Sequence, residues 1–89
     1  MTPPLLATIE DARRLVLDAL VDVAPDLEGT EIPADALLRE DLGLDSMDFM
    51  NLMAALSELL DADIPERDVS QLETVDACAA YLHERAGIR

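Results

Sequence analysis

The sequence predicts an all-α fold: a four-helix bundle with three longer helices, one short third helix and a long loop between the first two. Apolar residues recur at helical spacing in three segments of the chain. Only two aromatic residues occur, so the core must be aliphatic, and the three glycines together with little β-branching favour helix over strand. Its 89 residues suit one domain. We expect a single domain over 1–89, with flexible ends at 1–7 and 87–89.

The first helix is predicted to begin after Thr8, which has the side chain of an N-cap. Asp11, three residues later, completes a pattern similar to a capping box. The apolar stripe of this helix consists of Ile9, Ala12, Val16, Ala19, Leu20 and Val23. The helix should end before Pro25, because a residue that precedes proline is pushed out of the α region.

Residues 24–45 are predicted to form a long loop. The segment contains Pro25, Gly29, Pro33 and Gly43, which disfavour a continuous helix. Its apolar residues predict a loop that is held against the bundle: Leu27, Ile32, Leu37, Leu38, Leu42 and Leu44. A helical turn is expected around 34–39. A connection of this length in a small domain is usually functional.

The second helix, from Ser46 to about Asp61, has the strongest periodicity. Its broad apolar stripe consists of Phe49, Leu52, Met53, Leu56, Leu59 and Leu60. Pro65 is expected to start the short third helix, which ends near Leu72. Thr74 should cap the last helix, and Gly87 occupies the place of a C-cap glycine. One face of that helix carries Val75, Cys78, Ala79, Leu82 and Ala86.

Charge narrows the possible partners. Twenty acidic residues face six arginines and no lysine, giving a net charge of −14. This charge disfavours nucleic acids and anionic membranes, and favours basic patches on other proteins; solubility alone is the other interpretation. The lone Cys78 excludes an internal disulfide, and 1–7 has neither a basic region nor a long apolar run. We therefore expect a soluble, cytoplasmic, monomeric protein.

The segment from Glu40 to Asp48, Glu-Asp-Leu-Gly-Leu-Asp-Ser-Met-Asp, contains the candidate site. Gly43 permits a tight turn into the helix, and Asp45 and Asp48 are spaced to cap its first turn. Ser46 is then placed beside unpaired backbone N–H groups, where a phosphate ester would meet the positive end of the helix dipole. By position alone, Ser46 is better explained as an ordinary residue at a helix start, because serine is common there.

Within this segment, Asp-Leu-Gly-Leu-Asp-Ser-Met resembles the Asp-Ser-Leu attachment motif of acyl carrier proteins, with Met47 in place of leucine. The resemblance covers roughly 8–85 and includes Asp63-Ile-Pro-Glu66, Thr74-Val75 and Tyr81. It implies that Ser46 receives 4′-phosphopantetheine from coenzyme A, added by a separate phosphopantetheinyl transferase. The terminal thiol of this arm carries the acyl group as a thioester. The chain would then be a free-standing carrier and not an enzyme, with Ser46 as an attachment point and no catalytic residue.

A second surface of the helix after Ser46 has the composition of a docking site. Apolar and acidic residues lie together there: Met47, Met50, Ala54, Glu58 and Asp61. The resemblance implies partners of the acyl-transferring, ketosynthase or ligase type, with basic docking patches. Coverage of the methionines by the loop or third helix is the alternative. Asn51 and Ser57 replace acids that fatty-acid carriers tend to have, which favours a polyketide or specialised lipid pathway.

The resemblance also implies that an acyl chain can fold back between the helices. The candidate lining residues are Leu52, Met53, Leu56, Leu59 and Leu60, for which ordinary core packing is the alternative. We expect no metal site, because the sequence has neither an EF-hand loop nor a Cys/His cluster. Two other functions stay open. One is an acidic interaction module with an unmodified Ser46; the other is an aminoacyl carrier, although the Gly-Gly-His-Ser run of peptidyl carriers is absent.

Overall fold

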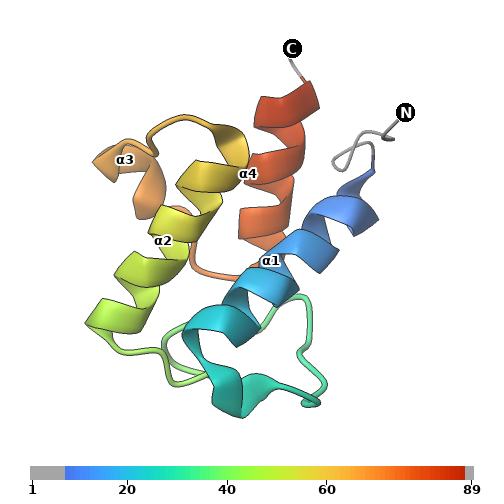
Figure 1. Ribbon diagram of the computed structural model, residues 1–89, viewed down its shortest axis with the longest axis vertical. Helices are drawn as coiled ribbons and strands as arrows, with labels where there is room; N and C mark the ends of the chain where they lie inside the picture. Colours follow the sequence, from blue (N-terminus) through green and yellow to red (C-terminus); the bar gives the residue numbers. More distant parts are fainter. Residues whose placement is uncertain (1–7, 88–89) are drawn as a thin grey trace.

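Three long α-helices, one single-turn α-helix and one 3₁₀ helix make up the part of the protein that the structure describes (Figure 1). The computed structural model describes residues 8–87. In chain order the elements are α1 (Ile9–Val23), the 3₁₀ helix η1 (Pro25–Leu27), α2 (Ser46–Leu60), α3 (Glu66–Val69) and α4 (Val75–Gly87). Within the described residues there is no strand, only an isolated antiparallel bridge between Leu37 and Thr74. The predicted all-α fold is confirmed.

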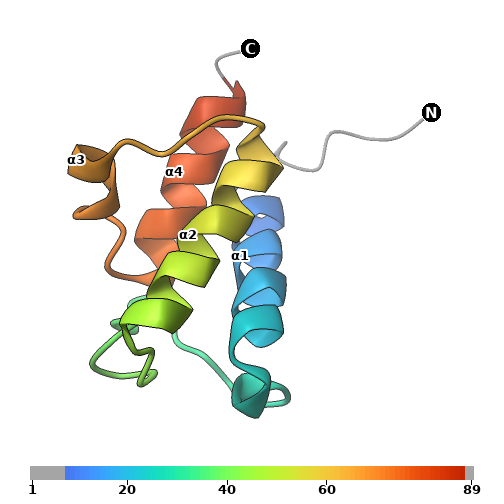
Figure 2. The ribbon, with the colours of Figure 1, turned by 60° about the vertical axis from the view of Figure 1, so that its left-hand side comes forward.

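The long helices pack side by side, with α1 against both α4 and α2. Figures 1 and 2 show that α2 and α4 run in the direction opposite to α1. The connection between α1 and α2 closes the end of the bundle where α2 begins, and α3 lies to one side of α2 and α4 (Figure 2). No helix among residues 8–87 combines the length and apolarity needed to cross a bilayer.

Side-chain caps fix the starts of the long helices where the sequence predicts them. The Thr8 Oγ1 accepts the N–H of Asp11 at 3.1 Å, and the Asp45 Oδ1 accepts the N–H of Asp48 at 2.8 Å. The Thr74 Oγ1 accepts the N–H of Ala77 at 3.0 Å. Each bond satisfies one of the amide groups that the first turn of a helix leaves without an internal partner.

The core is aliphatic and comes from the predicted stripes together with two leucines of the loop. Its buried members are Ala12, Val16, Ala19, Leu20, Leu38, Leu44, Leu52, Met53, Leu56, Leu72, Val75, Cys78, Ala79 and Leu82. Cys78 is fully buried, and burial raises the pKa of its thiol to about 12. The thiol therefore stays protonated and unreactive at neutral pH.

Backbone hydrogen bonds fasten the loop to the segment before and inside α4. The N–H of Leu38 donates to the carbonyl of Glu73 at 2.9 Å, and that of Asp76 to the carbonyl of Ala34 at 2.8 Å. The expected helical turn around 34–39 lies later in the chain, at 37–41, where the N–H of Asp41 donates to the carbonyl of Leu37 at 2.9 Å. The pairings of Ala34 and Leu38 use backbone groups that a helical turn at 34–39 would need. A tight turn closed by Ala36 and Pro33 stands there instead, with its N–H···O bond at 3.1 Å. The 3₁₀ helix η1 was also not predicted.

The third helix is shorter than expected. It begins after Pro65 as predicted but ends at Val69, not near Leu72. Tight turns follow, in which Gln71 N–H donates to the Asp68 carbonyl at 2.9 Å and Leu72 N–H to the Val69 carbonyl at 3.0 Å. This tighter winding accompanies the burial of Leu72 in the core.

The expected C-cap at Gly87 is also wrong, because Gly87 is the last residue of α4 itself. Any cap of this helix lies outside the described residues. The same holds for the expected flexible segments at 1–7 and 88–89, and for the Ala86 side chain on the predicted α4 face.

A cluster of polar side chains joins α3 to α4. The Tyr81 hydroxyl donates to the Asp68 Oδ2 at 2.8 Å, and Arg85 Nη2 donates to the same oxygen at 2.9 Å. The Arg85 guanidinium also lies 4.8 Å from the centre of the Tyr81 ring, within range of a cation–π contact. Asp68 is thus the residue through which α3 is held to the bundle by side-chain bonds.

Candidate functional site

Ser46 is exposed and is the first residue of α2. The preceding residues determine this placement. Gly43 has a φ of +76°, in the left-handed region that favours glycine, and so turns the chain. Leu44 is buried and anchors the turn to the core, and Asp45 is extended and caps the helix. The Ser46 hydroxyl therefore lies at the N-terminus of α2, where an enzyme can reach it.

The neighbour of Ser46 that sequence reasoning missed is Arg39. Its Nη2 donates a hydrogen bond of 3.1 Å to the Ser46 Oγ. The loop brings the two residues together, although seven positions separate them in the chain. A signal was present, because Arg39 is the one basic residue between Arg14 and Arg67.

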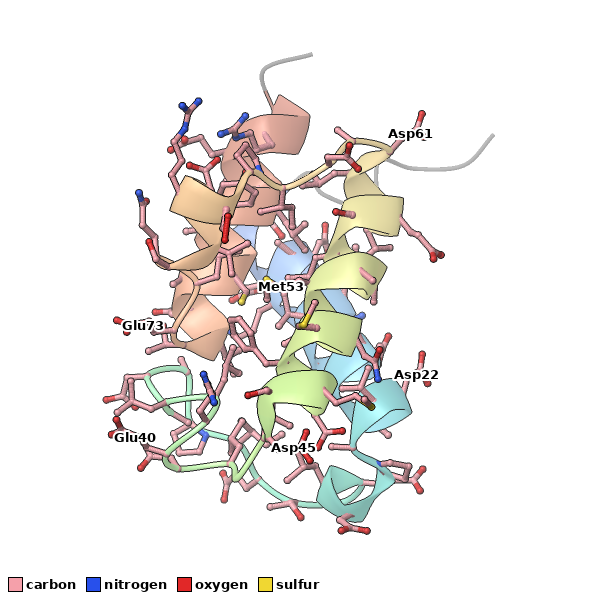
Figure 3. The ribbon with its side chains drawn as sticks, turned by 90° about the vertical axis from the view of Figure 1, so that its left-hand side faces the viewer. Asp22, Glu40, Asp45, Met53, Asp61 and Glu73 are labelled. Carbon is pink, nitrogen blue, oxygen red and sulfur yellow. The ribbon has the colours of Figure 1, made fainter. Side chains whose placement is uncertain are left out.

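An open groove of about 780 Å³ begins beside Arg39. It lies between the loop, the start of α2 and α3, and its lining includes Leu37, Leu44, Phe49 and Val69. Glu40 and Glu73, labelled in Figure 3, also line it. No role in a site was predicted for Leu37, Leu44 or Val69. The pairing of the loop with the segment around the start of α4 brings Leu37 and Leu44 there, and α3 brings Val69.

The residues predicted to line an acyl site lie elsewhere. Leu52 and Leu56 are fully buried and Met53 nearly so, as members of the core. Leu59 is 40% exposed and Leu60 is partly buried. None of the five is among the residues that line the groove beside Arg39. Their role with an acyl chain stays a prediction.

The residues predicted to form the docking surface are all exposed. Met47 and Met50 are 71% and 70% exposed, so the alternative that the loop or α3 covers them is wrong. Ala54, Glu58 and Asp61 are exposed as well. Figure 3 shows Asp45 and Asp61 at opposite ends of α2. Among the described residues, no cluster of three or more His, Cys, Asp or Glu side chains is placed to hold a metal ion.

Comparison with known proteins shows which family the chain resembles over most of its length. Residues 14–82 match the family described as "Phosphopantetheine attachment site". The chain is 32% identical over 78 residues to an acyl carrier protein of Akkermansia muciniphila, covering 88% of this chain and 91% of the relative. It is 36% identical over 67 residues to one of Streptomyces coelicolor, covering 75% and 73%. Another, from Bdellovibrio bacteriovorus, is 38% identical over 55 residues, covering 62% and 70%.

The fold and these matches define a carrier that bears a phosphopantetheine group. The chain belongs to the acyl carrier protein family. Its prosthetic group is a covalently attached 4′-phosphopantetheine, and other enzymes act on what it carries. The residues present fit the phosphodiester end of this group, because an exposed hydroxyl, a guanidinium and the start of a helix meet at Ser46.

Proposed function

We propose that Ser46 is the residue that bears 4′-phosphopantetheine, and that the chain delivers acyl groups to partner enzymes of a fatty-acid, polyketide or specialised lipid pathway. One observation carries the proposal. Within the family match at 14–82, Ser46 presents an exposed hydroxyl on the first residue of a capped helix. The chain has two other serines, of which Ser57 is partly buried within α2 and Ser70 follows α3.

Attachment requires an accessible nucleophilic oxygen more than a reactive one. A phosphopantetheinyl transferase would join the Ser46 Oγ to the pantetheine-side phosphorus of coenzyme A. The bond from that phosphorus to the adenosine bisphosphate breaks, and the serine loses its proton to the transferase. The protein's part is to present the hydroxyl, and Gly43, Asp45 and Asp48 do this by turning the chain and capping α2. The thiol at the far end of the arm supplies the chemistry that holds the acyl group.

We further propose that partner enzymes bind a docking face on α2 made of Met47, Met50, Ala54, Glu58 and Asp61. Its exposed methionines next to Ser46 provide apolar contact that adapts to partners of different shape. Its acids, with the net charge of −14, suit basic patches and speed encounter at low salt. Transferases, ketosynthases and ligases with such patches are the partners that this surface fits.

For the cargo, we propose that an acyl chain lodges against Leu52, Met53, Leu56, Leu59 and Leu60. Because Leu52 and Leu56 are fully buried, the helices must separate slightly to admit it. Asn51 and Ser57 make α2 less acidic than in fatty-acid carriers, which favours a polyketide or specialised lipid pathway. We also propose a single carrier domain that works as a monomer in the cytoplasm.

Intact-mass measurement tests the attachment. The protein is incubated with coenzyme A and a broad-specificity phosphopantetheinyl transferase, together with the variants Ser46→Ala, Ser57→Ala and Ser70→Ala. We expect the mass of one phosphopantetheine group to be added to all but Ser46→Ala. A gain that persists in Ser46→Ala would move the site elsewhere, and no gain in the native sequence would favour the acidic interaction module. Cargo trapped on the thiol in cells separates an acyl from an aminoacyl carrier.

A further inference from the structure

Arg39 is the basic side chain that the fold places at the attachment serine, 3.1 Å from its Oγ. Once a phosphodiester is formed on that oxygen, only the phosphorus atom separates Oγ from the charged phosphoryl oxygens. A planar guanidinium matches such oxygens in geometry and charge. The same side chain that donates to the bare serine is therefore within reach of the group that replaces its proton.

The surroundings of Ser46 favour a cation at this place. The chain neighbours of Ser46 are acidic, with Asp45 directly before it and Asp48 two residues after. A phosphodiester there adds a further negative charge beside two acids that are close in sequence, and like charges repel. The helix N-terminus offsets part of this repulsion, but the Asp48 amide is already occupied by the Asp45 carboxylate.

Arg39 is also available, because it forms no ion pair with a carboxylate in residues 8–87. By contrast, Arg13 is paired with Asp76 at 2.9 Å, and Arg85 with Asp68 at 2.9 Å. Arg67 lies 4.0 Å from Asp68. Because Arg39 bonds a serine hydroxyl and no carboxylate in the described residues, no ion pair has to break before it pairs with another anion.

We propose that Arg39 positions the prosthetic arm by pairing with the phosphodiester on Ser46, an inference that rests on Ser46 being the attachment residue. Arg39 lines the groove shared with Leu37, Leu44, Phe49 and Val69. The pair therefore holds the base of the arm at the mouth of this groove. Arg39 is a positioning residue: it does not react, and it limits the directions in which the arm leaves the serine.

Phosphorus-31 NMR of the loaded protein tests the pair directly. The native sequence, Arg39→Gln, Arg39→Lys and the control Arg14→Gln are loaded to completion, which intact mass verifies. Arg14 is an exposed arginine of α1 and matches the change in charge. For each protein the phosphorus resonance is measured folded and in urea, so that the unfolded chain gives the unpaired reference. An exposed ion pair of this kind favours the paired over the unpaired position of the phosphodiester by roughly two- to fivefold.

We expect the folded resonance of Arg39→Gln to move toward its unfolded position, with Arg14→Gln unchanged and Arg39→Lys between them. High salt should move the native resonance in the same direction as Arg39→Gln, because salt screens an exposed pair. If loading is complete and Arg39→Gln matches the native protein at low salt, the positioning role is refuted. If the native sequence gains no mass, or if Ser46→Ala gains the same mass as the native sequence, the attachment proposal fails instead.

Discussion

Replacing Asp68 by alanine should detach α3 from α4 and lower the stability of the whole domain. The Asp68 Oδ2 accepts two hydrogen bonds, from the Tyr81 hydroxyl at 2.8 Å and from the Arg85 guanidinium at 2.9 Å. The Asp68 side chain is 13% exposed, whereas that of Arg85 is 48% exposed. The two bonds therefore differ in how much solvent weakens them.

The size of the loss follows from these exposures. A bond from a neutral donor to a largely buried carboxylate contributes about 1.5–3 kcal/mol. The half-exposed arginine pair adds roughly 0.2–1 kcal/mol. Tyr81 is only partly buried, so water can reach its hydroxyl after the change, which favours the lower end. We expect Asp68→Ala to cost about 2 kcal/mol, which lowers the Tm of a domain this small by roughly 8–16 °C.

Urea unfolding followed by circular dichroism measures this cost. The matched control is Asp63→Ala, an exposed acid in the linker before α3, which removes the same negative charge. Asp68→Asn keeps an oxygen that can accept from Tyr81 and should lie between the two. If Asp68→Ala and Asp63→Ala change the free energy of unfolding by the same amount, within about 0.5 kcal/mol, the attachment of α3 through Asp68 is refuted.

Three further outcomes are expected. Charge reversal of Glu58 and Asp61 together should slow acyl transfer by a partner enzyme about tenfold at low salt, whereas reversal of Asp18 on α1 should not; equal rates would contradict the docking face. Because burial raises the Cys78 pKa from 9.0 to about 12, unfolding releases its proton above pH 9. Stability should be complete below pH 9 and fall between pH 9 and 12 by at most about 1.4 kcal/mol per pH unit. In Cys78→Ala the difference between the urea midpoints at pH 8 and pH 10.5 should therefore shrink. The part that remains comes from Tyr81, whose pKa burial also raises. An alkaline loss in Cys78→Ala as large as in the native sequence would rule the thiol out. Salt should raise the Tm by about 5 °C between 10 mM and 0.15 M, as screening weakens repulsion within a chain of charge −14, and an unchanged Tm would contradict this.

The long helices could be predicted because their signals are local. Thr8, Asp45 and Thr74 cap the helices whose starts they mark, and each acts on an amide three residues away. The apolar stripes of α1, α2 and α4 became the core because helical spacing alone decides which side chains share a face. The exposure of Ser46 could be predicted from the same local information, since the capping residue Asp45 and the turn-forming Gly43 lie within three residues of it.

The surroundings of the site depended on contacts between distant segments. The bonds of Ala34 and Leu38 to Asp76 and Glu73 place the loop, and no periodicity in the sequence encodes them. They displaced the expected helical turn to 37–41 and determined where the Arg39 side chain lies. The early end of α3 has a similar origin, because Leu72 is drawn into the core by packing that its own segment does not specify.

The parts of the structure around Ser46 differ in how firmly they are held. Ser46 stands on α2, which packs directly against α1 and α4. One wall of the groove beside it is the loop, which the buried Leu38 and Leu44 and several backbone bonds hold to the core. The other wall is α3, which has no buried residue of its own and is held by the side-chain bonds of Asp68. Elements with few contacts open at lower free energy than the core does. The α3 wall of the groove can therefore move while Ser46 and its cap stay in place.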